Sequence, residues 1–202
     1  MSRAKDKDNI DRFFHYGVDD VTRTIYMGST SSEEGYESGT DYQMAEYTIK
    51  GIHILESQAP NGDKPITIIM NNIGGEEIHG LAIYDAISLC KNHVTIKVFG
   101  HAMSMGGIIL QAADSRLMAP NSRFMMHYGT FSINANAKDA YKWMEENKKI
   151  DKFMEDLFFR KIKEKKPRFK REQLLKMLES DYIMNAKEAV EIGLATKIIG
   201  EE

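Results

Sequence analysis

The sequence predicts an α/β protein built on a mainly parallel β-sheet. Strand-like and helix-like segments alternate along most of the 202 residues, and this order is typical of parallel sheets covered by helices. Residues 65–70 form a short, continuous apolar run, as expected of a strand buried on both faces. Loops rich in small residues follow two of the expected strands, which is where open α/β sheets bind their ligands.

Composition favours one soluble domain and disfavours several classes of partner. Hydrophobic residues make up 42% of the chain and charged residues 28%, with a net charge of −3, so neither nucleic acid nor an anionic membrane is an expected partner. Cys90 is the single cysteine, which excludes an intrachain disulfide and fits a reducing compartment. No apolar run approaches the roughly 20 residues of a membrane span, and the polar N-terminus lacks a signal peptide. We therefore expect a cytoplasmic protein.

The first twenty residues are charged and carry only a short aromatic patch, at Phe13, Phe14 and Tyr16. Composition alone predicts a mobile terminus here. An arm that becomes ordered against a partner is the alternative.

Residues 21 to 99 predict two β-α steps and a further strand. The β-rich residues 21–27 form a strand that ends at Gly28, and a Ser/Gly/Glu-rich loop or helix start covers 29–40. A helix follows on which Met44, Thr48, Gly51, Ile52 and Leu55 share a face. After a turn at 60–63 come a strand at 65–70, a helix with Ile83, Ile87 and Cys90 on one face, and a strand at 94–99 closed by Gly100.

The second half is more helical. A helix is expected from about 104 to 113, then short strands at 116–119 and 123–127. A long amphipathic helix covers 139–162, longer than a crossover requires, which predicts a projecting arm. A helix from 171 to 179, a short helix opened by the capping box Asn185–Glu188 and closed by Gly193, and a strand at 195–199 complete the chain.

Ser104 lies among small residues in the loop 100–107, at a predicted strand-to-helix turn. A tight turn of this kind exposes a nucleophile beside free backbone N–H groups. The spacing is not the G-x-S-x-G of α/β-hydrolases, and a serine that merely caps the helix is the more common finding at such turns.

The second loop, 71–75, ends in Gly74 and Gly75. It fits a tight turn, or a bare backbone that donates hydrogen bonds to an oxyanion or a phosphate. No Gly-Lys-Ser/Thr follows, so it is not a Walker loop.

His127 ends the strand 123–127 and is well placed for proton transfer, although a lone histidine is more often structural. His79 and His101 lie near the two loops, and no histidine spacing predicts a metal site. Asp181 is notable only for its position at a helix-to-strand junction.

Four blocks of sequence resemble ClpP, the proteolytic subunit of the Clp proteases. The loop 71–75 resembles its N-S-P-G-G loop, and 100–106 its G-x-A-x-S-M-G nucleophile motif. Residues 120–127 resemble its P-N-S-R-x-M-x-H motif, and 181–194 the block that begins with its catalytic aspartate. The blocks occur in the family's order and cover about residues 21–200.

The resemblance implies a role for each matching residue. Ser104 would be the nucleophile, His127 the general base and Asp181 the residue that orients the imidazole, while the backbone N–H groups of Gly75 and Met105 would form the oxyanion hole. It implies a serine endopeptidase without metal or cofactor, in which ATP is used by a partner unfoldase and not by this chain.

The family also implies an architecture. A single peptidase domain with the ClpP/crotonase-type fold of repeated β-β-α units would cover 21–200, with a handle at about 130–163 that joins two heptameric rings into a tetradecamer. Residues 1–20 would be an N-terminal arm at the axial pore, where a Clp-type ATPase docks. Unfolded polypeptides would be cleaved inside the chamber.

Several departures leave alternatives open. Tyr128-Gly129 replaces the family's Gln-Pro, Ile73 replaces a proline, Glu179-Ser180-Asp181 lacks the family's arginine, and 164–171 is unusually basic. They indicate a divergent member, for which an assembly protein without catalysis is one alternative. A crotonase-type acyl-CoA enzyme is less favoured because the chain is short and carries the serine motif. A Ser–Lys peptidase is the weakest alternative, because His127 is available as the base.

Overall fold

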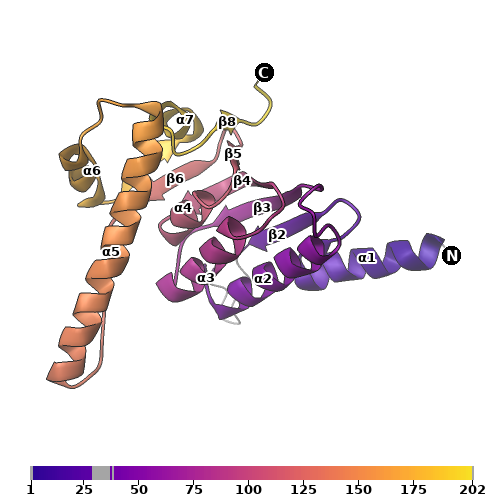
Figure 1. The fold of residues 1–202 in the computed structure, drawn as a ribbon, viewed down its shortest axis with the longest axis horizontal. Coiled ribbons are helices and arrows are strands. Elements are labelled where there is room, and N and C mark those ends of the chain that lie inside the picture. Colours follow the sequence, from indigo (N-terminus) through magenta and orange to yellow (C-terminus); the bar gives the residue numbers. More distant parts are fainter. Residues whose placement is uncertain (1, 29–36, 38, 202) are drawn as a thin grey trace.

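A computed structural model describes residues 2–28, 37 and 39–201, which form one twisted sheet with helices packed against it (Figure 1). The strands are β1 (Val18–Asp19), β2 (Thr24–Gly28), β3 (Ile66–Asn72), β4 (Val94–Met103), β5 (Ser115–Met118), β6 (Arg123–Met126), β7 (Tyr182–Asn185) and β8 (Lys197–Ile198). The helices are α1 (Ser2–Tyr16), α2 (Tyr42–Ser57), α3 (Glu77–Ser88), α4 (Met105–Leu110), α5 (Ala137–Lys165), α6 (Arg171–Leu178) and α7 (Ala186–Ile192).

The sheet is mainly parallel, as the sequence predicts. Its main order is β1-β2-β3-β4-β5-β8, and every neighbouring pair except β1–β2 is parallel. Helices α2, α3 and α4 connect successive parallel strands, as parallel pairing requires. The antiparallel pair β6–β7 extends the sheet from the far end of β4.

Strand β4 is longer than expected. The sequence predicts that Gly100 closes it, but the strand continues to Met103. Gly100 has φ +93°, and a Cβ there would lie 2.5 Å from Asn71 Oδ1, so only glycine fits. Asn71 Oδ1 also accepts a hydrogen bond of 2.9 Å from the His101 N–H. Before this irregularity β4 pairs with β3 and β5, and after it β4 still pairs with β3 while β6 replaces β5. This change of partner delivers the end of β4 to the candidate site.

The core lies between the sheet and its helices. All five residues predicted to share the buried face of α2 are buried, and so are Ile83 and Ile87 of α3. Cys90 lies beyond the end of α3 and is half-buried. The predicted capping box of α7 is present, and Gly193 closes that helix with φ +96°.

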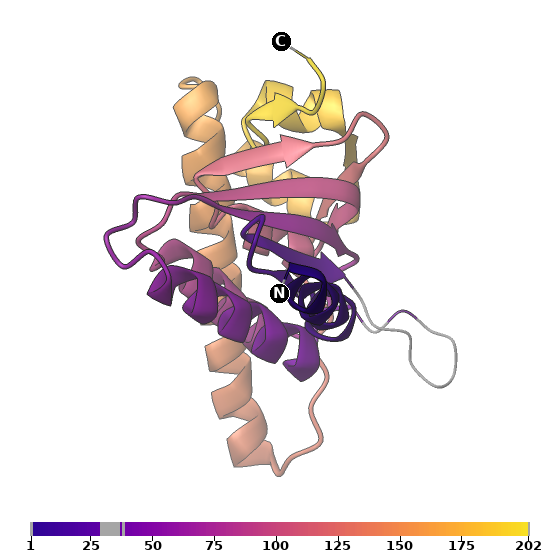
Figure 2. The same cartoon turned by 90° about the vertical axis from the view of Figure 1, so that its right-hand side faces the viewer.

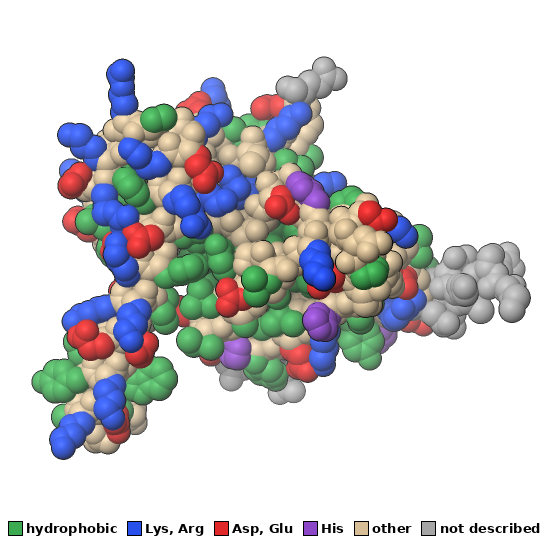
Figure 3. All heavy atoms as spheres, in the orientation of Figure 1, with side chains coloured by type: hydrophobic (Ala, Val, Ile, Leu, Met, Phe, Trp, Pro, Cys, Tyr) green, Lys and Arg blue, Asp and Glu red, His purple; other side chains and the backbone are tan. Residues whose placement is uncertain are grey.

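Helix α5 changes character along its length. Met154, Leu157, Phe158 and Ile162 are buried in its second half, where Phe158 meets Phe124 edge to face. The first half, with Tyr141, Trp143 and Met144 exposed, projects beyond the body together with the segment that leads into it (Figures 1 and 2). Figure 3 shows lysine and arginine side chains gathered over the opposite end of α5 and over α6, around the basic residues 164–171.

Residues 1–20, for which composition predicts a mobile terminus, have regular structure over most of 2–19. Helix α1 and strand β1 form there, and β1 pairs antiparallel with β2. The aromatic patch explains the order, because Phe13 packs against Tyr26 and Tyr16 against Tyr47. Most of the expected loop 29–40 lies outside the described residues. Across the described ranges, no helix has the length and apolar character needed to cross a membrane.

Candidate active site

Strand register brings together three residues that are far apart in the sequence. Met103 of β4 pairs with Met125 of β6, and the Ser104 N–H donates to the Met125 carbonyl at 2.9 Å. Met126 pairs antiparallel with Tyr182 of β7. Ser104 follows β4, His127 follows β6 and Asp181 precedes β7, so the three side chains meet at one edge of the sheet.

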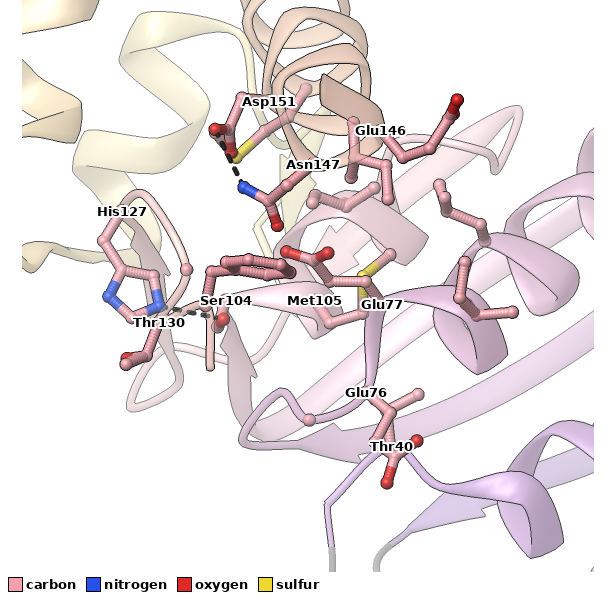
Figure 4. Close-up of a pocket in the computed structure, with 18 of the residues that line it drawn as sticks. Thr40, Glu76, Glu77, Ser104, Met105, His127, Thr130, Glu146, Asn147 and Asp151 are labelled. Atoms are coloured by element: carbon pink, nitrogen blue, oxygen red, sulfur yellow. Dashed lines mark hydrogen bonds between the residues drawn. The ribbon is translucent and has the colours of Figure 1, made fainter. Parts of the chain in front are cut away.

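The three side chains lie in a row, with the His127 imidazole between Ser104 and Asp181. Ser104 Oγ lies 2.9 Å from His127 Nε2 (Figure 4), and His127 Nδ1 lies 2.8 Å from Asp181 Oδ1. When the proton of the neutral imidazole is on Nδ1, beside the carboxylate, Nε2 is free to accept a hydrogen bond from the serine hydroxyl. In this arrangement the imidazole can remove the hydroxyl proton.

Ser104 has a backbone conformation that is rare for a residue with a side chain. Its φ is +50° and its ψ is −119°, a combination that typically costs 1–3 kcal/mol and occurs at functional sites. It is the N-cap residue of α4, yet among the described residues its side chain caps no backbone N–H. The alternative of a purely capping serine is therefore wrong, because the hydroxyl points to His127 instead.

The glycine loop lies directly beside Ser104. A Cβ on Gly74 would lie 2.6 Å from the Ser104 Cβ, and a Cβ on Gly75 would lie 2.4 Å from the Thr40 carbonyl oxygen. The Thr40 N–H donates to the Gly74 carbonyl at 2.5 Å, and the Glu76 N–H donates to the Thr40 carbonyl at 2.7 Å. The Gly74 carbonyl thus faces Thr40, and because the peptide bond is trans, the Gly75 N–H of the same peptide group faces away from Thr40.

A buried polar network supports this loop, and the sequence analysis missed it. Asn72 Oδ1 accepts from the Gly74 N–H at 2.8 Å and from Thr40 Oγ1 at 3.1 Å, and Asn72 and Thr40 are both fully buried. The sequence could have predicted it, because Asn72 lies on the same buried face of the strand as Ile66, Ile68 and Met70. An amide at such a position requires partners.

A cavity of about 880 Å³ opens beside the serine. Ser104, His127, Gly75 and Met105 line it from the sheet side, and the first half of α5 lines it from the other. Figure 3 shows the corresponding recess between the projecting part of α5 and the body. His79 and His101, which the sequence placed near the two loops, are not among the lining residues described.

Tyr128, which departs from the ClpP pattern directly after His127, makes two hydrogen bonds to other elements. The Tyr128 N–H donates to the Leu178 carbonyl at 3.0 Å, and its hydroxyl donates to Glu155 Oε1 at 2.7 Å. Burial and the Glu155 carboxylate raise the pKa of Tyr128, so the hydroxyl remains a donor. Tyr128 thereby ties the end of β6 to the end of α6, close to Asp181.

Asp181 is the most accessible of the three residues, with 64% of its side chain exposed against 24% for His127. Within the part of the chain that the structure describes, no group of three or more His, Cys, Asp or Glu side chains is arranged to hold a metal ion.

Comparisons with known proteins show the family of this chain. The family model described as Clp protease matches residues 35–202. The ATP-dependent Clp protease proteolytic subunit of Deinococcus radiodurans is 34% identical over 161 residues, which cover 79% of this chain and 76% of that protein. The chain therefore belongs to the Clp protease family and is a serine-type endopeptidase of the ClpP kind.

Proposed function

We propose that Ser104, His127 and Asp181 form a catalytic triad that hydrolyses peptide bonds of unfolded polypeptides through an acyl-enzyme. The observation that carries this proposal is the 2.9 Å hydrogen bond between the serine hydroxyl and the imidazole, together with the 2.8 Å contact between the imidazole Nδ1 and the carboxylate. Serine is a weak nucleophile until a neighbouring base removes its proton.

The reaction follows from these positions. Ser104 Oγ attacks the scissile carbonyl carbon while His127 Nε2 takes the hydroxyl proton. His127 then gives that proton to the leaving amine, and the C–N bond breaks to leave an ester on Ser104. Water, deprotonated by His127, hydrolyses the ester and restores the serine. Asp181 fixes the imidazole tautomer and stabilises the imidazolium that forms twice in each cycle.

The backbone N–H groups of Gly75 and Met105 would hold the oxyanion. Both residues line the cavity beside Ser104, and Met105 is the first residue of α4, whose N–H has no acceptor within the helix. The Asn72 hydrogen bond to the Gly74 N–H would keep the loop in place before substrate arrives.

Gly75→Ala is expected to lower kcat for a peptide substrate by about 10²–10³-fold, the usual loss for one oxyanion donor. The new Cβ would lie 2.4 Å from the Thr40 carbonyl oxygen and move the loop. The matched control is Gly62→Ala, which also has a positive φ and a carbonyl oxygen 2.6 Å from the new Cβ, but outside the cavity lining. Equal kcat in wild type and the folded Gly75→Ala variant would contradict the assignment.

We expect several copies of this chain to assemble into a particle that encloses the active sites. The proposed particle is two stacked heptameric rings joined by the handle at about 130–163, whose exposed Tyr141, Trp143 and Met144 are suited to contact a second copy. The peptidase domain at 21–200 would face an internal chamber. Residues 1–20, whose helix α1 lies at the end of the molecule away from α5 (Figure 1), would contact a Clp-type ATPase unfoldase in the cytoplasm, and ATP would be used by that partner.

The direct test is degradation of a fluorescein-labelled unfolded protein, followed by release of fluorescent fragments. The purified chain, checked for ring assembly by sedimentation, is expected to release fragments without added metal or cofactor. Hydration of an enoyl-CoA with no fragment release would instead favour the crotonase-type alternative. A folded assembly inactive in both assays would favour a protein that has kept the fold and lost catalysis.

A further inference from the structure

The cavity beside Ser104 has an apolar wall and an acidic end. Leu81, Ile108, Ile150 and Met154 contribute the apolar surface. Glu77, from the first turn of α3, and Asp151, from α5, contribute carboxylates to the same cavity. The side chain that fits both surfaces has an aliphatic stem and a cationic head, as lysine and arginine do.

Among the described residues, no cationic side chain pairs with Glu77 or Asp151. The described lining of the cavity contains neither lysine nor arginine. Glu77 makes no hydrogen bond or ion pair with another described residue, and Asp151 accepts a hydrogen bond of 3.2 Å from Asn147. By contrast, Glu146 at the same cavity already pairs with Lys149 at 2.6 Å. A positively charged ligand group would therefore meet two carboxylates that no other cation occupies.

The electrostatics of the two carboxylates point the same way. Burial and the charge of Asp151 raise the pKa of Glu77, and burial and the charge of Glu155 raise the pKa of Asp151. Each carboxylate is thus destabilised in its charged form, and a cation beside it would stabilise that form.

Glu77 is also close to the catalytic residues. A Cβ at position 129 would lie 3.0 Å from Glu77 Oε1, so Gly129 leaves room for the carboxylate two residues after His127. In Figure 4, Glu77 points into the space that Ser104 borders on one side and Asn147 and Asp151 on the other. Position 129 is one of the departures from the ClpP pattern, and it accommodates an acid at this cavity.

We infer that this cavity selects a lysine or arginine side chain on the residue that supplies the scissile carbonyl, with Glu77 as the principal specificity residue and Asp151 beside it. This inference rests on the proposed function, because it takes Ser104 as the nucleophile. The side chain of that residue starts one bond from the attacked carbonyl carbon, so it enters the space that opens at Ser104, Gly75 and Met105. The stem would lie on Leu81, Ile108 and Met154, and the cationic head would reach Glu77.

The test uses peptide aminomethylcoumarin amides that differ only in the residue before the coumarin. Lysine is compared with norleucine, which has a similar stem and no charge, and with leucine. The wild-type assembly is expected to show a kcat/KM for lysine at least about tenfold above that for norleucine. Glu77→Gln is expected to lower this ratio about tenfold or more and to leave kcat/KM for norleucine within about threefold.

Glu145→Gln is the matched control, because Glu145 pairs with Lys148 on α5 and is not among the cavity residues described. It should leave the lysine-to-norleucine ratio unchanged. A wild type that cleaves norleucine or leucine in preference to lysine would overturn the inference and leave the proposed function standing, as would an unchanged ratio in Glu77→Gln. A wild-type assembly that hydrolyses no member of the series would overturn both.

Discussion

Ser104→Ala is expected to abolish peptide hydrolysis, with kcat falling by about 10⁴–10⁶-fold, as when the nucleophile of a serine protease is removed. The reason is chemical, since without Oγ no acyl-enzyme can form. The activity that remains would come only from substrate binding and the oxyanion donors. The measurement is turnover of a fluorogenic peptide at saturating substrate.

The variant also separates chemistry from folding. Ser104 Oγ hydrogen-bonds only to His127 among the described residues, so alanine should leave the thermal unfolding temperature and the sedimentation profile close to those of wild type. Ser88→Ala, on the exposed end of α3, is the control for loss of a serine hydroxyl. Wild-type turnover in folded Ser104→Ala protein would refute the assignment of the nucleophile.

Asp181→Asn is expected to lower kcat by about 10⁴-fold with little change in fold. The amide can donate a hydrogen bond to His127 Nδ1, which favours the tautomer with the proton on Nε2. A protonated Nε2 cannot accept the serine proton. Because 64% of the Asp181 side chain is exposed in the single chain, the substitution leaves no buried charge or cavity. Steady-state kinetics on the assembled protein measure the effect.

Asp63→Asn removes an exposed carboxylate in the turn at 60–63 and should not alter kcat. If Asp181→Asn retained full kcat, Asp181 would not orient the imidazole. The 2.8 Å contact would then be only a surface ion pair of small energetic value.

Local patterns predicted the elements well wherever one face of a segment is buried by its neighbours. The helical spacing of Met44, Ile52 and Leu55 and the capping box at Asn185 each correspond to what the structure has. Two features that the sequence did not predict come from contacts between distant segments. Strand β4 continues past Gly100 because β6 offers a second partner, and α1 is ordered where its aromatic side chains meet Tyr26 and Tyr47.

The residues of the candidate site also differ in how far local sequence patterns could predict them. Ser104 and the glycine loop carry a signal in the sequence, because loops of small residues after the strands of an open α/β sheet lie where ligands bind. Asp181 could be chosen only by resemblance, since its proximity to His127 depends on the register between β6 and β7. Thr40 and Asp151 reach the site from segments far from Ser104 in the chain, and no spacing rule connects them to it.

Labelling with a fluorophosphonate probe, followed by mass spectrometry of the modified peptide, tests the catalytic triad most directly. The probe reacts only with a serine that a neighbouring base activates. The triad predicts one adduct, on Ser104, that is lost in His127→Ala protein of unchanged assembly. An unlabelled Ser104 in a well-folded assembly, or equal labelling after His127→Ala, would contradict it.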